Sequence, residues 1–291
     1  MKTSLEHLPE NERHEIQRII DIIREVVEPE IIILFGSYAQ ESSVDDRYHT
    51  SDGIANEYLS DYDFLVITRS DPKEPYAQES TIMDRVDRYR PPVNIEIYSI
   101  DYVNEGLRWG QCFFTEIVKV GIVVHDTGIS KFVVPRELTS FERRQRAQDY
   151  FDIWFKRGVD FYGVVPISLE MGSLKVGVFN LHQATESLYY TVLLVFGGHK
   201  PRLHNLWRLR KKAKPYSSAL YRLFQTEASK HDDHLFDLLK RGYIDARYKE
   251  DYIISVKELS ELIDRIGKMI AIVESICHRH LLTLGPDETE G

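Results

Sequence analysis

The sequence predicts two domains of different fold class. Residues 1–134 are expected to form an α/β (α+β) domain with a small mixed sheet, and residues 135–291 an all-α helical bundle. In the first half, short apolar runs bounded by turn-forming residues alternate with amphipathic segments, which is typical of an α/β domain. Beyond Pro135 the apolar residues recur at helical spacing only. A length of 291 residues also suits two domains of ordinary size.

The first half predicts strands and helices in alternation. Runs rich in β-branched residues and bounded by turn formers indicate buried strands, and a 3.6-residue apolar period that stops at Pro29 indicates the first helix. The expected order is a helix at 10–28, strands at 31–35 and 61–67, a turn or linker at 71–75, a helix at 80–89, a strand at 93–98, a helical region at 98–121 and a short strand at 122–126.

The second half predicts about five helices. Thr139 or Ser140 can cap a helix that runs to about residue 161, with Glu142 available to its first turn. Its aromatic stripe is expected to lie in the core: Phe141, Tyr150, Phe151, Trp154 and Phe155. The other helices are expected from 168 or 174 to 196, and at 203–212, 217–239 and 252–278, followed by a frayed tail from residue 281.

Composition narrows the classes of protein that fit. With 43% apolar and 29% charged residues the chain is globular, and its net charge of −9 argues against broad, sequence-independent nucleic-acid binding. The first residues lack an apolar signal core, and no stretch approaches the about 18 apolar residues of a membrane span, so a cytoplasmic protein with no membrane partner is expected. Cys112 and Cys277 lie far apart and are expected to be buried or idle thiols.

Asp61 and Asp63 are the first candidate site residues. Residues i and i+2 of a strand point to the same face, with α-carbons about 6.6 Å apart. Two carboxylates about 5 Å apart repel by about 3 kcal/mol at an effective dielectric constant of about 20, and a divalent cation such as Mg²⁺ relieves that repulsion. The alternative is a pair of turn and cap residues ahead of a strand.

Two further features fit a site that binds phosphate and metal. Gly36 and Ser37 end the first strand, where a glycine lets backbone approach a ligand, exposed amides can cradle an anion and the serine hydroxyl can donate to a phosphate oxygen. Glu96 lies on the polar face of the alternating strand at 93–98. It is either a third metal ligand or a solvent-facing glutamate on an open sheet.

In this order the motifs resemble the signature of the minimal nucleotidyltransferases of the DNA polymerase β-type superfamily. The resemblance implies that Gly36 and Ser37 bind a nucleoside triphosphate such as ATP, and that Asp61 and Asp63 hold two Mg²⁺ ions with Glu96 as third carboxylate. Two features depart from the family pattern. Residues 38–60, 23 in all, form an insertion about twice the usual gap, expected to be a loop beside the active site. Gln40-Glu41 stands where many relatives carry Arg-Gly, which puts the strength of triphosphate binding in doubt.

The second half resembles a HEPN domain, a helical bundle often encoded beside or fused to minimal nucleotidyltransferases. The motifs, spread over about 150 residues, are Asn180-Leu181-His182-Gln183-Ala184-x-Glu186-x-Leu188, Gly197-Gly198, His204-Asn205-Leu206-x-x-Leu209 and Tyr243-Ile244-Asp245-Ala246-Arg247-Tyr248. Many HEPN domains are ribonucleases that use an arginine, four to six residues and then a histidine. None of the eleven histidines here has an arginine five to seven positions before it. RNA cleavage, which needs a general acid–base and a cation for the developing charge, is therefore the least favoured function.

The resemblance favours a role for the bundle in acceptor binding. The candidate acceptor-binding residues are His182, Glu186, His204, Tyr243, Arg247 and Tyr248. His182 and Glu186 share one helical face, where they can hold a polar ligand or form a buried hydrogen bond. Residues 200–214 contain seven basic and no acidic residues, and form either a solvated basic face or a site for phosphate or an RNA end.

The first hypothesis is a Mg²⁺-dependent nucleotidyltransferase that moves a nucleoside monophosphate from an NTP to an acceptor. The acceptor, whether a small molecule, a tRNA end or a protein hydroxyl, stays open. The oligomeric state also stays open, with a homodimer as the possibility that the resemblance to HEPN bundles raises. The second hypothesis is a nucleotide-binding or toxin–antitoxin-like interaction module without transferase activity.

Overall fold

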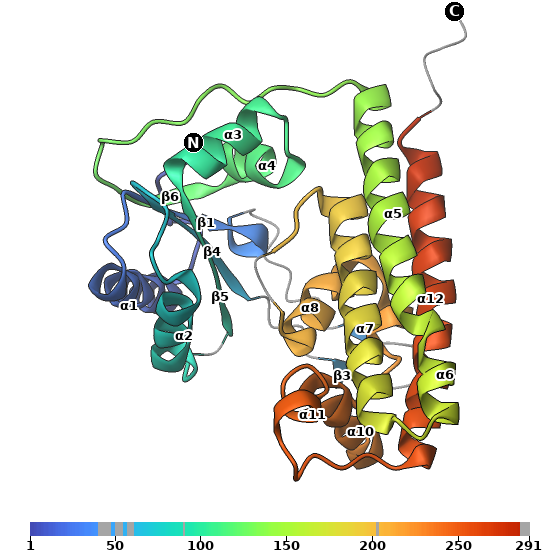
Figure 1. The fold of residues 1–291 in the computed structure, drawn as a ribbon. Coiled ribbons are helices and arrows are strands. Elements are labelled where there is room, and N and C mark those ends of the chain that lie inside the picture. The colour runs from blue at the N-terminus through green and yellow to red at the C-terminus, as the bar shows by residue number, and fades with distance from the viewer. Residues whose placement is uncertain (40–47, 50–54, 57–60, 90, 202–203, 286–291) are drawn as a thin grey trace, which may run out of the picture. The chain divides into compact units, whose positions relative to one another are not determined.

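The computed structural model describes residues 1–39, 48–49, 55–56, 61–89, 91–201 and 204–285. The chain folds into two compact units, Met1–Glu137 and Leu138–Gly291. The first unit combines helices with a mixed sheet and the second is helical, as Figure 1 shows, so the predicted fold class is confirmed. Among the helices of these residues, none is long and apolar enough to cross a membrane.

The sheet of the first unit has the order β5-β4-β1-β6 within the described residues. Strand β1 (Ile31–Phe35) is antiparallel to both β4 (Tyr62–Thr68) and β6 (Ile122–Asp126), whereas β4 is parallel to β5 (Val93–Ser99). A two-residue ladder of β2 (Tyr48–His49) and β3 (Ala55–Asn56) lies within the stretch predicted as an inserted loop. The rest of that insertion from residue 40 to residue 60, Gln40 and Glu41 included, lies outside the described residues.

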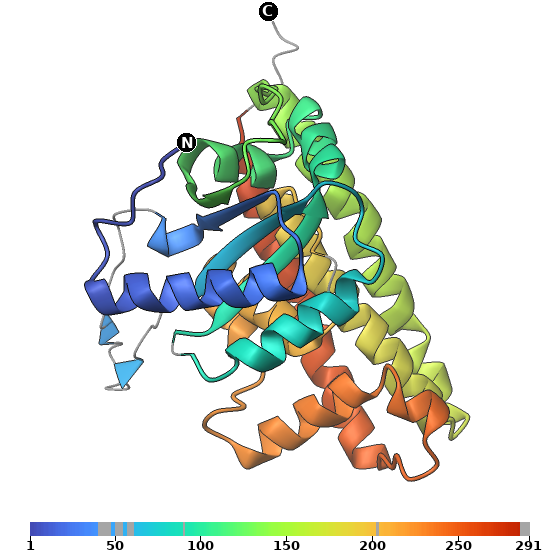
Figure 2. The same ribbon diagram turned by 90° about the vertical axis from the view of Figure 1, so that its left-hand side faces the viewer.

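Helices cover both faces of this sheet. α1 (Glu10–Val26) and α2 (Pro75–Val86) pack on one face, and α3 (Ile100–Arg108) and α4 (Cys112–Val120) on the other (Figures 1 and 2). Side chains of β4 alternate between the two cores, with Phe64 toward α1 and Leu65 toward α3. The polar beginnings of β4 and β5 lie beyond these apolar residues, where the candidate site is expected.

Two predicted elements of the first unit have different bounds. The second helix begins at Pro75, five residues earlier than predicted, because a proline is well placed in a first helical turn. The helical region predicted at 98–121 is wrong in part, since Tyr98 and Ser99 belong to β5 and the rest forms two helices. Ser99 caps α3 by accepting from the Tyr102 amide, and Gly110, with φ +64°, turns the chain before α4.

Three long helices of the second unit lie side by side: α5 (Ser140–Gly163), α7 (Leu174–Gly197) and α12 (Val256–Thr283) (Figure 1). Capping boxes start α5 at Thr139 and α12 at Ser255. The shorter helices are α6 (Val165–Glu170), α8 (Leu206–Ala213), α9 (Ser218–Tyr221), α10 (Lys230–Arg241) and α11 (Asp245–Tyr248). Four members of the predicted aromatic stripe, Tyr150, Phe151, Trp154 and Phe155, pack in or against the core.

One predicted helix of the second unit is wrong. Residues 217–239 form two helices, because Ser217 and Ser229 each cap a separate start and the chain turns between them. The last helix starts and ends later than predicted, since Ser255 caps it and it continues through Thr283 into the stretch expected to fray. Residue 168 belongs to α6, so the helix predicted from 168 or 174 begins at the second of these positions.

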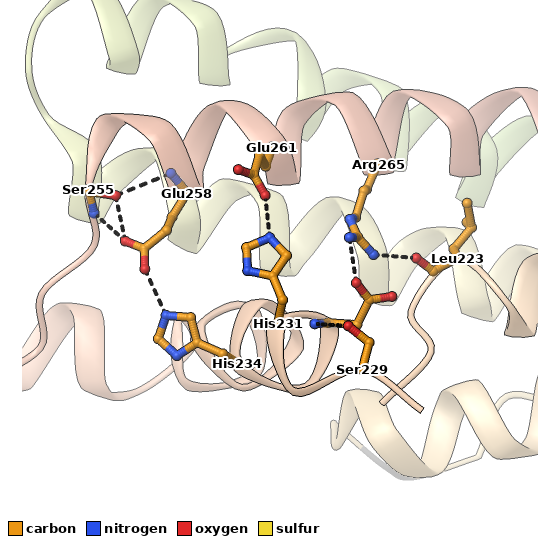
Figure 3. Close-up of polar contacts among 9 residues, drawn as sticks. Leu223, Ser229, His231, His234, Ser255, Glu258, Glu261 and Arg265 are labelled. Carbon is orange, nitrogen blue, oxygen red and sulfur yellow. Dashed lines mark hydrogen bonds and ion pairs between the residues drawn. The ribbon is translucent and has the colours of Figure 1, made fainter. Parts of the chain in front are cut away.

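Three polar pairs hold α10 against α12 (Figure 3). His234 pairs with Glu258 at 2.7 Å and His231 with Glu261 at 2.6 Å, while Arg265 donates to Asp232 at 2.6 Å. Glu258 also accepts from the backbone amide and the hydroxyl of Ser255. Three of the predicted acceptor-binding side chains, Tyr243, Arg247 and Tyr248, follow α10 in the chain.

The contact between α10 and α12 should depend on pH through Glu258. Hydrogen bonds from Ser255 and His234 lower the pKa of Glu258 from 4.5 to about 2. A carboxylate with a lowered folded-state pKa stabilises the fold above its unfolded pKa, and that contribution is lost as the pH falls from about 4.5 to about 2. Glu258→Gln should therefore lower the free energy of unfolding at neutral pH by about 1 kcal/mol. The free energy of unfolding of this variant should also fall less steeply as the pH is lowered.

Urea unfolding between pH 2 and pH 7 measures this effect. Glu274→Gln is the matched control, because Glu274 is exposed on the same helix. If the free energy of unfolding falls equally steeply with decreasing pH in Glu258→Gln and in the wild type, Glu258 is not the group that makes stability depend on acid.

Candidate functional site

The turn after β1 lies against the carboxylate of Asp63. Phe35, the last residue of β1, pairs with Asp63 in the antiparallel register. Gly36 then adopts φ +76° and opens a short 3-10 turn over Gly36–Tyr38, with Ser37 half-buried in it. A β-carbon at Gly36 would lie 2.6 Å from Oδ2 of Asp63, closer than real side chains come. Only glycine fits this position, so the predicted phosphate-binding turn and the predicted metal ligand are in direct contact.

Asp61 and Asp63 project to the same place. Oδ2 of Asp61 and Oδ1 of Asp63 both accept from Nδ2 of Asn94, each at 3.0 Å. Tyr62, between them, is fully buried on the opposite face, where its hydroxyl donates to Glu15. The predicted convergence of the two aspartates is therefore present, and it is completed by an amide.

Asn94 is a site residue that the sequence interpretation missed. It lies directly across from Asp63 in the parallel pairing of β4 with β5. Its place on the polar face of the strand is visible in the sequence, because Asn94, Glu96 and Tyr98 alternate with apolar residues. The register between two strands far apart in the chain is not visible, so the sequence could not choose between Asn94 and Glu96.

Glu96 lies one step further along the strand, opposite Leu65. Its side chain is 7% exposed, and one carboxylate oxygen accepts from the Tyr98 hydroxyl at 3.0 Å. Within the part of the chain that the structure describes, no group of three or more His, Cys, Asp or Glu side chains could hold a metal ion. The role of Glu96 as the third metal ligand stays a prediction.

In the second unit, the predicted acceptor-binding side chains form one connected cluster around Tyr243. The Tyr243 ring stacks on His182, with centroids 5.2 Å apart, and lies parallel to His204 at 6.2 Å. His204 Nδ1 is 2.8 Å from a carboxylate oxygen of Glu186. The Arg247 guanidinium lies 4.7 Å from the Tyr243 ring centre and 4.9 Å from that of Tyr248. We call these six residues the Tyr243 cluster.

Residues 151–276, which hold the whole Tyr243 cluster, match the family described as the HEPN domain. The second unit contains a HEPN domain. This match confirms the predicted resemblance of the helical half, and the mixed sheet of the first unit is compatible with a nucleotidyltransferase. No curated protein matches the chain.

His182 of the HEPN domain is buried and neutral. Burial lowers its pKa from 6.5 to about 4, and its side chain is 1% exposed. Nδ1 is 3.1 Å from the carbonyl oxygen of Leu239 on α10, so in the neutral ring Nδ1 donates this hydrogen bond. Nε2 is then an acceptor, and it has no hydrogen-bond partner among the described residues. Because the ring is buried, only a small donor inside the domain, such as a bound water, can reach this atom.

Charge in the Tyr243 cluster is set by burial and by its neighbours. Burial raises the pKa of Glu186, and the hydrogen bond and charge of His204 oppose that rise. Burial also lowers the pKa of Lys200, whose ammonium lies 4.2 Å from the centre of the Tyr190 ring. Phe179, which the sequence interpretation missed, stacks on Tyr243 at 6.4 Å and lies one helical turn before His182. Its side-chain type resembles ordinary core residues, so nothing in the sequence marked it.

The basic stretch at 200–214 does not form one uniform surface. Arg210 is 1% exposed and donates to backbone oxygens within the domain. Lys211 and Lys214 lie over the rings of Trp207 and Tyr221. Binding of RNA by this stretch stays a hypothesis, and Arg210 cannot take part in it without leaving the core.

Proposed function

We propose that the protein is a Mg²⁺-dependent nucleotidyltransferase that transfers a nucleoside monophosphate from an NTP to an acceptor and releases pyrophosphate. The observation that carries the proposal is the meeting of Asp61 and Asp63 on one atom beside the Gly36 turn. Two carboxylate oxygens that converge on a single point offer hard, negatively charged ligands, the kind that Mg²⁺ prefers.

The donor set fits a divalent cation. Asp61 and Asp63 would hold the metal, two ions by analogy with the family, with Glu96 as the proposed third carboxylate. When bound, Mg²⁺ supplies Lewis-acid stabilisation of phosphoryl oxygens and orients the phosphates. The chain's own residues perform the remaining steps. The Gly36 turn lies beside Asp63, where its amides would bind phosphate and the Ser37 hydroxyl would donate to a β- or γ-phosphate oxygen.

The HEPN domain has the proposed role of acceptor binding. The Tyr243 cluster combines stacked rings with the Arg247 cation. Rings and guanidinium groups bind planar or anionic groups. These properties suit an acceptor that carries a planar or anionic part.

A second candidate function is nucleotide binding without transfer, in a module that interacts with a partner as toxin–antitoxin-like proteins do. Two observations favour it. The Asn94 amide lies between the two aspartates, and the Glu96 carboxylate already accepts a hydrogen bond from Tyr98. HEPN domains are usually ribonucleases or nucleotide-binding domains. No histidine of this chain has an arginine five to seven positions before it, so RNA cleavage is the least favoured activity of this HEPN domain.

Incubation of the purified protein with each α-³²P-labelled NTP and a cell extract tests the proposal. We expect one class of molecule to become labelled, in step with pyrophosphate release, and the labelling to need Mg²⁺. Tight NTP binding in calorimetry without labelling of any molecule would favour the second candidate. Fragmentation of RNA in the same extract with EDTA present would favour RNA cleavage.

A further inference from the structure

The amide of Asn94 occupies the point on which the two aspartates converge. Asn94 faces Asp63 across the parallel pair of strands, and its single nitrogen donates to both carboxylates at 3.0 Å. Carboxylates can only accept hydrogen bonds, so they select the NH₂ end of the amide. A cation at the same point would select the opposite end, since cations bind oxygen and are repelled by an N–H group.

We propose that Asn94 is a reversible amide ligand, whose nitrogen holds Asp61 and Asp63 together and whose oxygen turns inward to bind the cation. A rotation of the terminal amide exchanges the two ends without moving the strand, and that torsion has a broad, two-fold profile. The proposal rests on the proposed function for the identity of the cation site. It adds an amide ligand to the proposed carboxylates of that site.

Asn94 contacts the two aspartates directly. Glu96 lies opposite Leu65, is 7% exposed and is bonded by the Tyr98 hydroxyl, whereas Asn94 is half-buried and already contacts both aspartates. A neutral amide also explains how two carboxylates remain close together, because each of the two N–H groups can satisfy one of them. Asn94 therefore both positions the aspartates and can complete the cation's oxygen ligands.

Substitutions at Asn94 separate this role from a purely structural one. Asn94→Ala should weaken Mn²⁺ binding at least about tenfold, as loss of a metal ligand or its support does. Asn94→Asp should bind Mn²⁺ at least about tenfold more tightly, because a third carboxylate adds charge at the same point. The same variant should have a lower melting temperature without Mn²⁺, where three carboxylates repel, and should recover when Mn²⁺ is added. A structural role alone gives no gain in affinity.

Titration of the full chain with Mn²⁺, followed by the electron paramagnetic resonance signal of the free ion, is the experiment. It compares the wild type with Asn94→Ala, Asn94→Asp and the control Asp84→Asn, whose side chain is exposed on α2, each checked for fold by circular dichroism. We expect Asp84→Asn to bind within about threefold of the wild type, a difference below 1 kcal/mol. If Asn94→Ala binds as tightly as the wild type, the role of Asn94 is wrong and the proposed function stands. If neither the wild type nor Asn94→Asp binds Mn²⁺, both fail.

Discussion

Asp63→Asn should abolish nucleotidyl transfer and leave the fold intact. Asp63 lies against the Gly36 turn and shares the Asn94 amide with Asp61. Asparagine has the same shape but removes the negative charge, and its oxygen can still accept from Asn94. Loss of one preorganised electrostatic group at a reacting phosphate costs about a hundredfold to a thousandfold, and loss of a ligand shared by two ions should cost at least the upper value.

The measurement is transfer of label from α-³²P-NTP, with melting temperature and circular dichroism as tests of the fold. Asp84→Asn is the matched control, because Asp84 is exposed on α2 and the substitution changes the same net charge. Transfer by Asp63→Asn within a few-fold of the wild type would remove Asp63 from the mechanism. If Asp63→Asn has lost activity and also has a lowered melting temperature, Asp63 has a structural role instead.

The sequence predicted the first unit well where the signal is local. A strand such as β1 has an apolar, β-branched run with a glycine at its end, and both features belong to the strand itself. The same local pattern placed Asp61 and Asp63 on one face. Nothing local defines which residue of β5 lies opposite Asp63, because that register depends on the packing of α2, α3 and α4 around the sheet. Asn94 was missed for that reason.

The second unit shows a related limit. The apolar pattern of residues 217–239 is compatible with one helix, yet the chain forms α9, a turn and α10. The turn is fixed by a residue from elsewhere, Arg210 of α8, which donates to the carbonyl oxygens of Tyr221 and Phe224. The serines at 217 and 229 were the available local signal, since each caps a helix. In contrast, the motifs around His182 and Tyr243 predicted residues that do lie together.

Arg210→Met should destabilise the HEPN domain by about 3–5 kcal/mol, because it leaves several buried oxygen acceptors without their donor. The Arg210 side chain is 1% exposed, and its guanidinium donates to Tyr221, Phe224 and Thr226 while lying 3.8 Å from the centre of the Tyr221 ring. Methionine fills a similar volume but cannot donate. The carbonyl oxygens of the turn would lose their partner, and each buried acceptor left unpaired costs about 1–3 kcal/mol.

Urea unfolding of the full chain measures this change, because two of the three tryptophans, Trp154 and Trp207, lie in the HEPN unit. Arg222→Met is the control, since Arg222 is exposed in the same turn, and it should change stability by less than about 0.5 kcal/mol. Equal midpoints for the two variants would show that the turn between α9 and α10 does not depend on Arg210. A large loss of unfolding free energy in Arg210→Met alone would show that Arg210 stabilises the fold. Any RNA contact of the basic stretch would then depend on the other residues of that stretch.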